Sequence, residues 1–241
     1  MTEVFQSDIL RAQSELLEAS LSEIPDEERK QRRGITRRLS QVFFELVNRL
    51  APPLVLEIGA HEGTFSATVK NSRPESRVIA FEANPLIYER YAPAMKQAGV
   101  EYLQLCVADR VGEMTLKVPA HHGREKHGKG SILTHKKAAD FVDYRVGAVT
   151  LDGFLGDAAN SPSAMWVDVE GALAHIFAGA ERTLRNCVAI HLEMETTALW
   201  EGQIIDTDVV SRLEVCGLRP VLRDIQHPRQ YNAIFLRSAA P

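Results

Sequence analysis

One stretch constrains the fold of this chain more than any other, namely residues 54–66, which read LVLEIGAHEGTFS. The apolar residues from Leu54 to Ile58 form a short block that is typical of a parallel strand covered on both faces. Gly59 and Gly63 then lead into a helical pattern, and a glycine lets a ligand or a neighbouring element approach the backbone closely. Backbone amides at the start of that helix can face a polar ligand. The stretch therefore predicts a strand, a tight turn and a helix that together form a nucleotide-type site.

The spacing of the glycines indicates which nucleotide fits. A dinucleotide fold uses Gly-x-Gly-x-x-Gly, and here His61 and Thr64 stand where the second and third glycines are required. The spacing Glu57-x-Gly59-x-x-x-Gly63 instead resembles the first motif of class I methyltransferases. Their ligand, S-adenosylmethionine, has no phosphates, and a carboxylate near the turn suits its cationic end.

Length and charge narrow the class of protein. With 241 residues the chain can form one α/β domain with an added N-terminal segment, or two small domains. A net charge of −4 gives no global case for binding nucleic acid or an anionic membrane. The odd number of widely spaced cysteines favours buried free thiols in a reducing compartment. Without an apolar signal region or a run of about 18 apolar residues, we expect a soluble cytoplasmic protein.

Residues 1–50 precede the first strand and carry two helical patterns. Between Ile35 and Leu50, large apolar residues recur every three or four positions and form one stripe along a helix, which two prolines just after Leu50 prevent from continuing. A looser stripe predicts an earlier helix over Ser7–Ser22. Because the main stripe would otherwise expose seven large apolar side chains, we expect residues 1–50 to be docked, as a lid or as a homodimer face.

A second strand is predicted at Arg77–Phe81 and runs directly into Glu82, Ala83 and Asn84. In a doubly wound sheet the carboxyl end of this strand lies beside the first turn, so Glu82 can accept hydrogen bonds from ribose hydroxyls. The alternative is that Glu82 is a carboxylate near the N-terminus of the next helix, predicted at Pro85–Gln97.

The third strand is predicted from Tyr102 to Val107 and ends in Ala108 and Asp109. A polar group at this strand end can face an adenine ring, although Asp109 can equally cap the turn. Gly112 then begins a short hairpin with the sequence GEMTLKV.

Residues 119–137 interrupt all periodicity and are rich in histidine, lysine and arginine. No pair of these histidines has a companion Cys or carboxylate at a spacing typical of a structural zinc site. We therefore expect a mobile basic substrate loop, which docks back onto the domain at Ser131–Leu133.

The two strands predicted at residues 164–169 and 188–192 both lead into acidic side chains, which are Asp168, Glu170, Glu193 and Glu195. Asp168 and Glu170 are two positions apart and so point the same way on a strand. Open α/β sheets bind their ligands at the carboxyl ends of the strands, so we expect these carboxylates to gather there, although such acids also cap loops. His191, within the second strand, is expected to be a satisfied core histidine.

The remaining chain predicts helices at Leu173–Arg185 and Thr207–Cys216 and strands at Pro220–Asp224 and Asn232–Arg237. The last two form a hairpin that would place an antiparallel strand in the sheet.

Six motifs in order resemble the FkbM-type methyltransferases: LEIGAHEGTFS, AFEANP, VADRVGEMTL, VTLDGFL, WVDVEGALAHIFAGAERTL and YNAIFLR. The resemblance covers residues 54–237 and makes residues 51–241 the methyltransferase domain. It implies a Rossmann-like α/β class I fold, with a mostly parallel seven-stranded sheet and an antiparallel C-terminal strand. It also implies S-adenosylmethionine as donor and a hydroxyl of a sugar, glycan or secondary metabolite as acceptor.

Carried over by position, the resemblance implies one set of donor-binding and one set of catalytic residues. The expected cofactor contacts are Glu57, Gly59, Ala60, His61, Gly63, Thr64, Glu82, Ala83, Asn84, Ala108, Asp109 and Asp168. The catalytic residues are Asp168, Glu170 and Glu193. Two positions depart from the family pattern, since Trp166 stands where a Lys is common and His61 where an Asn is frequent.

Methyl transfer to oxygen requires the acceptor in line with the methyl group, and a carboxylate can take the hydroxyl proton. Asp168 is the expected base, with Glu170 or Glu193 orienting it. We assign no metal ligand, although the same carboxylates could hold Mg²⁺ against a sugar diol. The alternatives are a non-catalytic nucleoside-binding module and an NAD-dependent dehydrogenase, and the missing glycines and the lack of a Tyr-x-x-x-Lys pair disfavour the latter.

Overall fold

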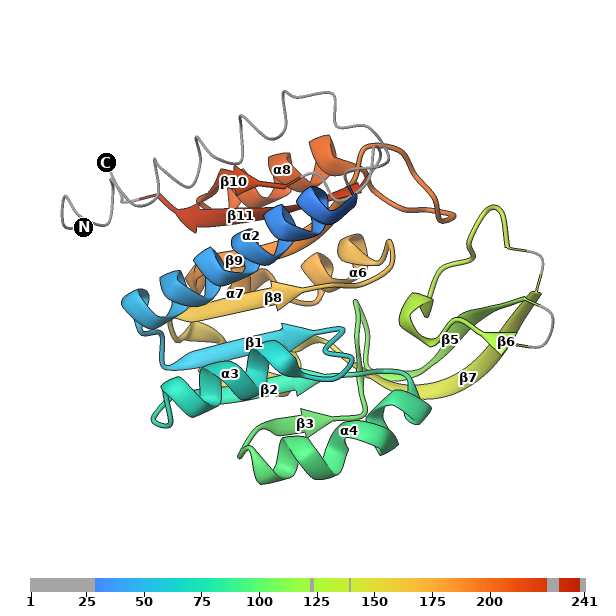
Figure 1. Cartoon of the computed structure of the whole chain (residues 1–241), viewed down its shortest axis with the longest axis horizontal. Helices are drawn as coiled ribbons and strands as arrows, with labels where there is room; N and C mark the ends of the chain where they lie inside the picture. The colour runs from blue at the N-terminus through green and yellow to red at the C-terminus, as the bar shows by residue number, and fades with distance from the viewer. Residues whose placement is uncertain (1–28, 122–123, 139, 225–229, 239–241) are drawn as a thin grey trace.

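A computed structural model describes residues 29–121, 124–138, 140–224 and 230–238 of the chain (Figure 1). The helix expected at Ser7–Ser22 lies outside the described residues. Within them, no helix combines the length and the apolar character that crossing a bilayer would require.

The chain folds around a seven-stranded sheet with the order β10-β11-β9-β8-β1-β2-β3. Its strands are β1 (Leu54–Ile58), β2 (Arg77–Phe81), β3 (Glu101–Leu103), β8 (Ser163–Val167), β9 (Cys187–Glu195), β10 (Leu218–Arg223) and β11 (Gln230–Arg237). β11 runs antiparallel to both of its neighbours, whereas the other neighbouring strands are parallel. This arrangement confirms the predicted class I sheet with an antiparallel C-terminal strand. β1 lies inside the sheet, and every one of its residues is buried.

Helices cover both faces of this sheet (Figure 1). One face carries α2 (Arg29–Leu50), α3 (Thr64–Ser72) and α4 (Pro85–Gln97). The other face carries α5 (Leu151–Leu155), the short 3-10 helix η3 (Gly156–Asn160), α6 (Leu173–Ala178), α7 (Glu181–Asn186) and α8 (Asp206–Val215). The prediction of a single helix at 173–185 is wrong, because α6 and α7 are two separate helices there. The chain breaks at Gly179, where a Cβ atom would collide with the backbone carbonyl of Ala108.

The apolar stripe on α2 is docked on the sheet, as expected for this helix. Leu39, Phe43 and Val47 are fully buried in the core that α2 forms with α3, α4 and one face of the sheet. The ring of Phe43 lies 5.8 Å from Trp166 of β8 and 5.5 Å from His191 of β9, measured between centroids. The helix is thus part of the hydrophobic core of the sheet domain.

A second sheet of four strands, in the order β4-β7-β5-β6, corrects the expectations for residues 106–149. Its strands are β4 (Cys106–Val107), β5 (Gly112–His121), β6 (Arg124–Glu125) and β7 (Asp140–Val149), and the 3-10 helix η2 (His127–Lys129) follows β6. β5 continues beyond the predicted hairpin and pairs with β7 from Gly112↔Ala148 to Ala120↔Asp140. The predicted third strand is also split, because β3 belongs to the large sheet and β4 to the small one. We call this small sheet the hairpin sheet.

The expected docking point of the basic loop is confirmed. The hydroxyl of Ser131 donates a hydrogen bond to the backbone carbonyl of Glu170 at 2.6 Å and accepts one from the amide of Leu133 at 3.0 Å. The hairpin sheet projects to one side of the large sheet (Figure 1), and this contact ties it to the segment that follows β8.

Candidate active site

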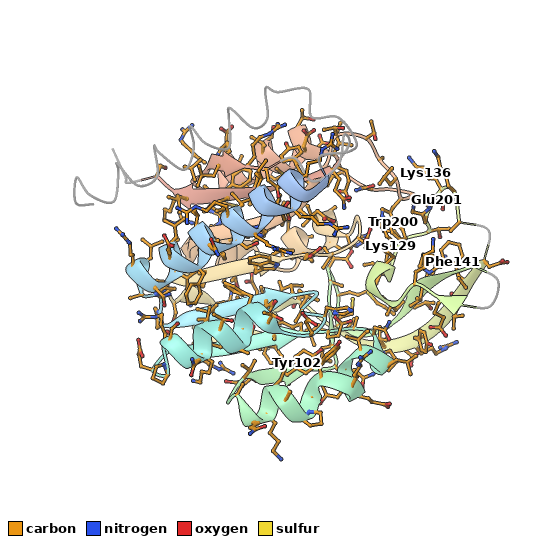
Figure 2. All side chains as sticks on the ribbon, viewed as in Figure 1. Tyr102, Lys129, Lys136, Phe141, Trp200 and Glu201 are labelled. Atoms are coloured by element: carbon orange, nitrogen blue, oxygen red, sulfur yellow. The ribbon has the colours of Figure 1, made fainter. Side chains whose placement is uncertain are left out.

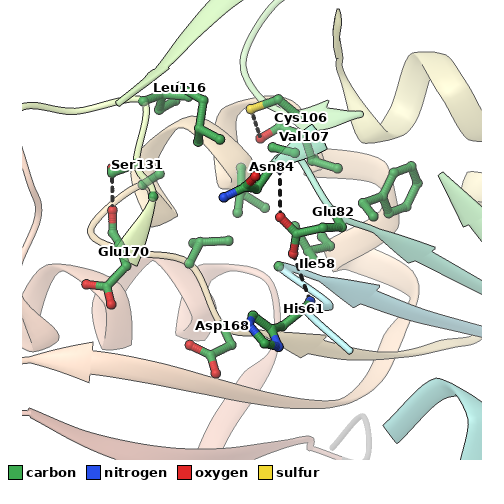
Figure 3. Close-up of a pocket in the computed structure, with 18 of the residues that line it drawn as sticks. Ile58, His61, Glu82, Asn84, Cys106, Val107, Leu116, Ser131, Asp168 and Glu170 are labelled. Atoms are coloured by element: carbon green, nitrogen blue, oxygen red, sulfur yellow. Dashed lines mark hydrogen bonds between the residues drawn. The ribbon is translucent and has the colours of Figure 1, made fainter. Parts of the chain in front are cut away.

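A cavity of about 210 Å³, here called the cleft, lies at the carboxyl ends of β1, β2 and β8 (Figure 3). The hairpin sheet and the loop before it supply the facing wall, with Leu105, Cys106, Val107, Leu116, Ser131 and Ile132. A second cavity of about 440 Å³ lies on the α2 side of the glycine turn and shares Gly59, His61 and Asp168 with the cleft. The strand ends therefore bring Glu82, Asp168 and Glu170 to one hollow, as an open α/β sheet is expected to do, whereas the predicted catalytic residue Glu193 does not line it.

Two other parts of the chain pack directly against the backbone of the glycine turn. Gly59 has φ +78°, and a Cβ atom there would collide with the backbone carbonyl oxygen of Asp168. Gly63 has φ +66°, and a Cβ atom there would collide with the sulfur of Met95 on α4. Both positions thus require glycine for backbone conformation and for close packing. The absence of a side chain at Gly63 thus lets Met95 of α4 pack against the turn.

Glu57 is buried on β1, and its Oε2 accepts a hydrogen bond from the backbone amide of Ser66 at 3.0 Å. Ser66 is in the first turn of α3, so the carboxylate stabilises the start of this helix. Burial raises the pKa of Glu57 to about 7, against the opposing effect of the hydrogen bond with Ser66. The carboxyl group also lines the second cavity, together with Ser40, Gln41 and Phe44 of α2.

Glu82 joins the two turns that follow β1 and β2. Its Oε2 accepts from the backbone amide of His61 at 2.8 Å, and its Oε1 accepts from the amide of Asn84 at 2.7 Å (Figure 3). Desolvation raises the pKa of this carboxyl group. Asn84 in turn accepts from the amide of Leu86 at 3.0 Å and caps α4. Glu82 thus lines the cleft with a fixed orientation.

The structure distributes the other predicted cofactor residues unevenly. Gly59, His61, Glu82, Ala83, Asn84 and Asp168 line the cleft, Glu57, Ala60 and Thr64 line the second cavity, and Gly63, Ala108 and Asp109 line neither. The carboxylate of Asp109 is 3.1 Å from Arg110 Nε and 3.2 Å from His175 Nδ1, outside the cleft. Ala108 and Asp109 were expected to line the cleft after the third strand. The residues that line it there are Leu105, Cys106 and Val107. The sequence signal for them is the apolar strand pattern itself, since they carry no polar motif.

Asp168 and Glu170 follow β8, and both side chains line the cleft (Figure 3). Asp168 stays exposed toward the cleft, yet the surrounding protein atoms desolvate its carboxyl group and raise its pKa. Burial likewise raises the pKa of Glu170, whose Oε1 lies 4.0 Å from Lys129 Nζ. The turn between them and α6 needs Gly171, because a Cβ atom there would lie 2.6 Å from Cδ1 of Trp200.

Glu193 and Glu195 of β9 lie beside Glu170, as expected for acids on neighbouring strands. One oxygen of each of these three carboxylates lies within 4.8 Å of the other two. The pKa is raised to about 9 for Glu193 and to about 7 for Glu195. Burial is the largest cause, and repulsion by the nearby carboxylates is the next. At an effective dielectric constant of about 20, two full charges at such a distance repel by roughly 3.5 kcal/mol. We call Glu170, Glu193 and Glu195 the acidic triad.

His191 is a core residue, as predicted, but its ring is not hydrogen-bonded. Neither ring nitrogen has a hydrogen-bond partner within the described part of the chain. The ring instead stacks on Trp166 with 3.7 Å between centroids, and burial lowers its pKa to about 3, so it is neutral. Trp166, where the family commonly has a Lys, also packs against Phe65 of α3 and lines the second cavity.

The strand order, the antiparallel β11 and the acid after β2 beside a glycine turn are those of the class I methyltransferase fold. The methyltransferase FkbM domain matches residues 57–220. The chain therefore belongs to the FkbM methyltransferase family, and it is an enzyme of that class.

One curated relative and two solved structures are similar to this chain. The 2-O-methyltransferase NoeI of Sinorhizobium fredii is 26% identical over 163 residues, which cover 63% of this chain and 67% of NoeI. Precorrin-6y C5,15-methyltransferase from Geobacter metallireducens aligns with 77% of this chain and 80% of its own, at 16% identity and a TM-score of 0.41. A 1,6-didemethyltoxoflavin-N1-methyltransferase from Burkholderia thailandensis aligns with 99% and 92%, at 13% identity and a TM-score of 0.41. With TM-scores below 0.5, these two structures do not bear on the chemistry of the chain.

S-adenosylmethionine, the cofactor of the family, matches the chemistry of the residues present. Its adenosine part combines a flat apolar ring with a ribose diol, and the cleft combines apolar walls at Phe81, Leu105 and Ile132 with the carboxylate of Glu82. Its other end is cationic, and the shared wall of the two cavities carries the carboxylate of Asp168.

Proposed function

We propose that the protein transfers a methyl group from S-adenosylmethionine to a hydroxyl oxygen of a sugar, a glycan or a hydroxylated secondary metabolite. The observation that carries this proposal is that one cleft is lined by Glu82, which can accept hydrogen bonds from a ribose, and also by Asp168 and Glu170. The name of the relative NoeI, a 2-O-methyltransferase, supports oxygen as the acceptor atom.

The donor is held by the residues that line the cleft. S-adenosylmethionine supplies a methyl group activated by a positively charged sulfur. Glu82 accepts hydrogen bonds from the ribose hydroxyls, since its carboxylate is already oriented by two backbone amides. Phe81, Leu105 and Ile132 pack against the adenine ring. Gly59, His61, Ala83, Asn84 and Asp168 complete the donor contacts.

Asp168 acts as the general base that takes the proton of the attacking hydroxyl. Its exposure to the cleft gives it access to an acceptor, and its raised pKa makes it a stronger base near neutral pH. Glu170 or Glu193 orients Asp168, and of these two only Glu170 lines the cleft. The backbone at Glu170 is fixed by Ser131, so the hairpin sheet positions this side of the cleft.

Within the predicted N-terminal segment of residues 1–50, α2 forms a wall of the site in this proposal. Ser40, Gln41 and Phe44 of α2 line the second cavity together with the glycine turn, so the N-terminal segment and the methyltransferase domain share one site. The sheet already covers the apolar stripe of α2. Pairing of two chains into a homodimer stays a prediction, to be tested by light scattering.

The variant Asp168→Asn tests the base directly. Asn keeps the shape of the side chain and loses the ability to take a proton, so single-turnover methyl transfer to a hydroxylated acceptor should slow by about 10²- to 10⁴-fold. The melting temperature should stay close to that of the wild type. Affinity for S-adenosylhomocysteine should fall far less than turnover does, because Asp168 is one of several donor contacts. Wild-type turnover by the folded variant would exclude Asp168 as the base and leave positioning as the source of the rate.

A further inference from the structure

We propose that the acidic triad, Glu170, Glu193 and Glu195, is a binding site for a hard divalent cation of the Mg²⁺ or Mn²⁺ type. The three residues come from two neighbouring segments, the turn after β8 and the end of β9. The site itself is independent of the proposed acceptor.

The geometry of the acidic triad fits one ion. An oxygen of each carboxylate lies within 4.8 Å of the other two. Carboxylate oxygens lie about 2.0 to 2.1 Å from Mg²⁺ and about 2.3 to 2.6 Å from Ca²⁺, so two oxygens on one ion are at most about 4 Å apart on Mg²⁺ and about 5 Å apart on Ca²⁺. Carboxylate oxygens are also the ligands that Mg²⁺, Mn²⁺ and Ca²⁺ favour over softer metals.

An unpartnered oxygen of Glu195 points independently to a missing ligand. Glu195 is only 3% exposed, and its Oε1 has no hydrogen-bond partner within the described residues. Its other oxygen, Oε2, accepts from Gln203 Nε2 at 2.6 Å. Gln203 is fixed in turn, because its Oε1 accepts from the amides of Leu199 at 2.7 Å and Trp200 at 3.0 Å. A buried acceptor held in place but left without a donor is rare and indicates that a ligand belongs there.

The nearby positive charge does not complete the site. Lys129 Nζ lies 4.0 Å from Glu170 Oε1, and the lysine side chain is 60% exposed to solvent. A solvated ammonium at this distance is a weak partner. Glu193 and Glu195 are 7% and 3% exposed, so their charges are far less screened than that of Lys129. A small cation between the three carboxylates would neutralise them more completely.

An ion can reach the acidic triad from solvent. A cavity of about 350 Å³ adjoins Glu170 and is lined by Lys129, Trp200 and Gln230, and Figure 2 labels the first two between the hairpin sheet and the large sheet. On the other side, Glu170 lines the cleft next to Asp168. If the proposed function holds, the cation would bind acceptor oxygens and make the reacting hydroxyl more acidic.

The test is titration of the full-length, EDTA-dialysed protein with Mn²⁺, followed by the loss of the free-ion signal in electron paramagnetic resonance and by calorimetry. Neither S-adenosylmethionine nor an acceptor is present. We expect one Mn²⁺ per chain, displaced by excess Mg²⁺. Glu195→Gln and Glu193→Gln should each weaken binding at least tenfold, since even outer-shell changes at metal sites cost about 10- to 100-fold.

Glu113→Gln is the matched control, because this exposed glutamate pairs with Arg145 on the hairpin sheet, outside the acidic triad. It should bind Mn²⁺ like the wild type. The melting temperature of each triad variant is measured as well, and its Mn²⁺ affinity is compared with that of the wild type only if the variant is folded. Absence of Mn²⁺ binding to the wild type at millimolar concentration, or unchanged affinity in both folded variants, would overturn the site. Mn²⁺ binding without any methyl transfer to hydroxyls would instead refute the proposed function alone.

Discussion

Replacing Glu82 by Gln perturbs the residue that joins the two turns of the site. Each carboxylate oxygen of Glu82 accepts one backbone amide, from His61 at 2.8 Å and from Asn84 at 2.7 Å. Gln has a single carbonyl oxygen and an NH₂ group, so it can accept one of the two amides and places a donor against the other. One charge-assisted hydrogen bond is therefore lost in the free protein, which costs about 1.5 to 3 kcal/mol.

The same change removes an acceptor for the ribose hydroxyls. We expect the affinity for S-adenosylhomocysteine to fall roughly 10- to 100-fold by calorimetry. For a domain of this size the stability loss corresponds to a decrease in melting temperature of about 3 to 12 °C. Glu89→Gln, an exposed position on α4, is the control and should change neither quantity. A less stable variant with wild-type affinity would show that Glu82 only holds the turns together, and unchanged values of both would refute the assignment entirely.

Two further predictions concern the core and a buried acid. Phe43→Ala should lower the free energy of unfolding, measured in urea, by about 3 to 5 kcal/mol, because the ring is fully buried between α2 and the sheet. A loss below about 1 kcal/mol would mean that α2 is not part of the core. Burial raises the pKa of Glu57 from 4.5 to about 7, so the folded state binds its proton more tightly than the unfolded state does. The resulting stabilisation is fully present below about pH 4.5 and is lost as the pH rises through about 7, by up to about 3 kcal/mol. Relative to the wild type, Glu57→Gln should therefore gain melting temperature between pH 5 and pH 8, and parallel pH profiles would contradict the shift.

Much of the large sheet could be predicted because its strands are buried on both faces. β1 and β2 are mostly apolar, apart from Glu57 in β1 and Arg77 at the start of β2, and each is followed by a turn with an acid or a glycine. The acids after β2 and β8 were found for the same reason, since strand ends are visible in the sequence and the doubly wound topology places them together.

The hairpin sheet could not be predicted in the same way. β7 has no continuous apolar run, and most of its residues are exposed or half-buried. Its sequence does alternate from Val142 to Ala148, which is typical of a strand with one covered face, so this signal was present and was missed. Its pairing with β5 spans a long intervening segment and depends on tertiary contacts, including the bond between Ser131 and Glu170. The early turn at residues 104–105 moves Asp109 out of the cleft and brings Leu105 into it. No local pattern marks such a turn.

The most direct measurement is the fate of a ¹³C-labelled methyl group. The protein is incubated with methyl-labelled S-adenosylmethionine and a set of mono- and oligosaccharides, and the product is analysed by nuclear magnetic resonance. We predict a methyl carbon bonded to the oxygen of a former hydroxyl, formed at a rate that Asp168→Asn reduces by about 10² or more. Label on nitrogen or carbon, or formation of the same ether at the same rate by Asp168→Asn, would contradict this account of the site.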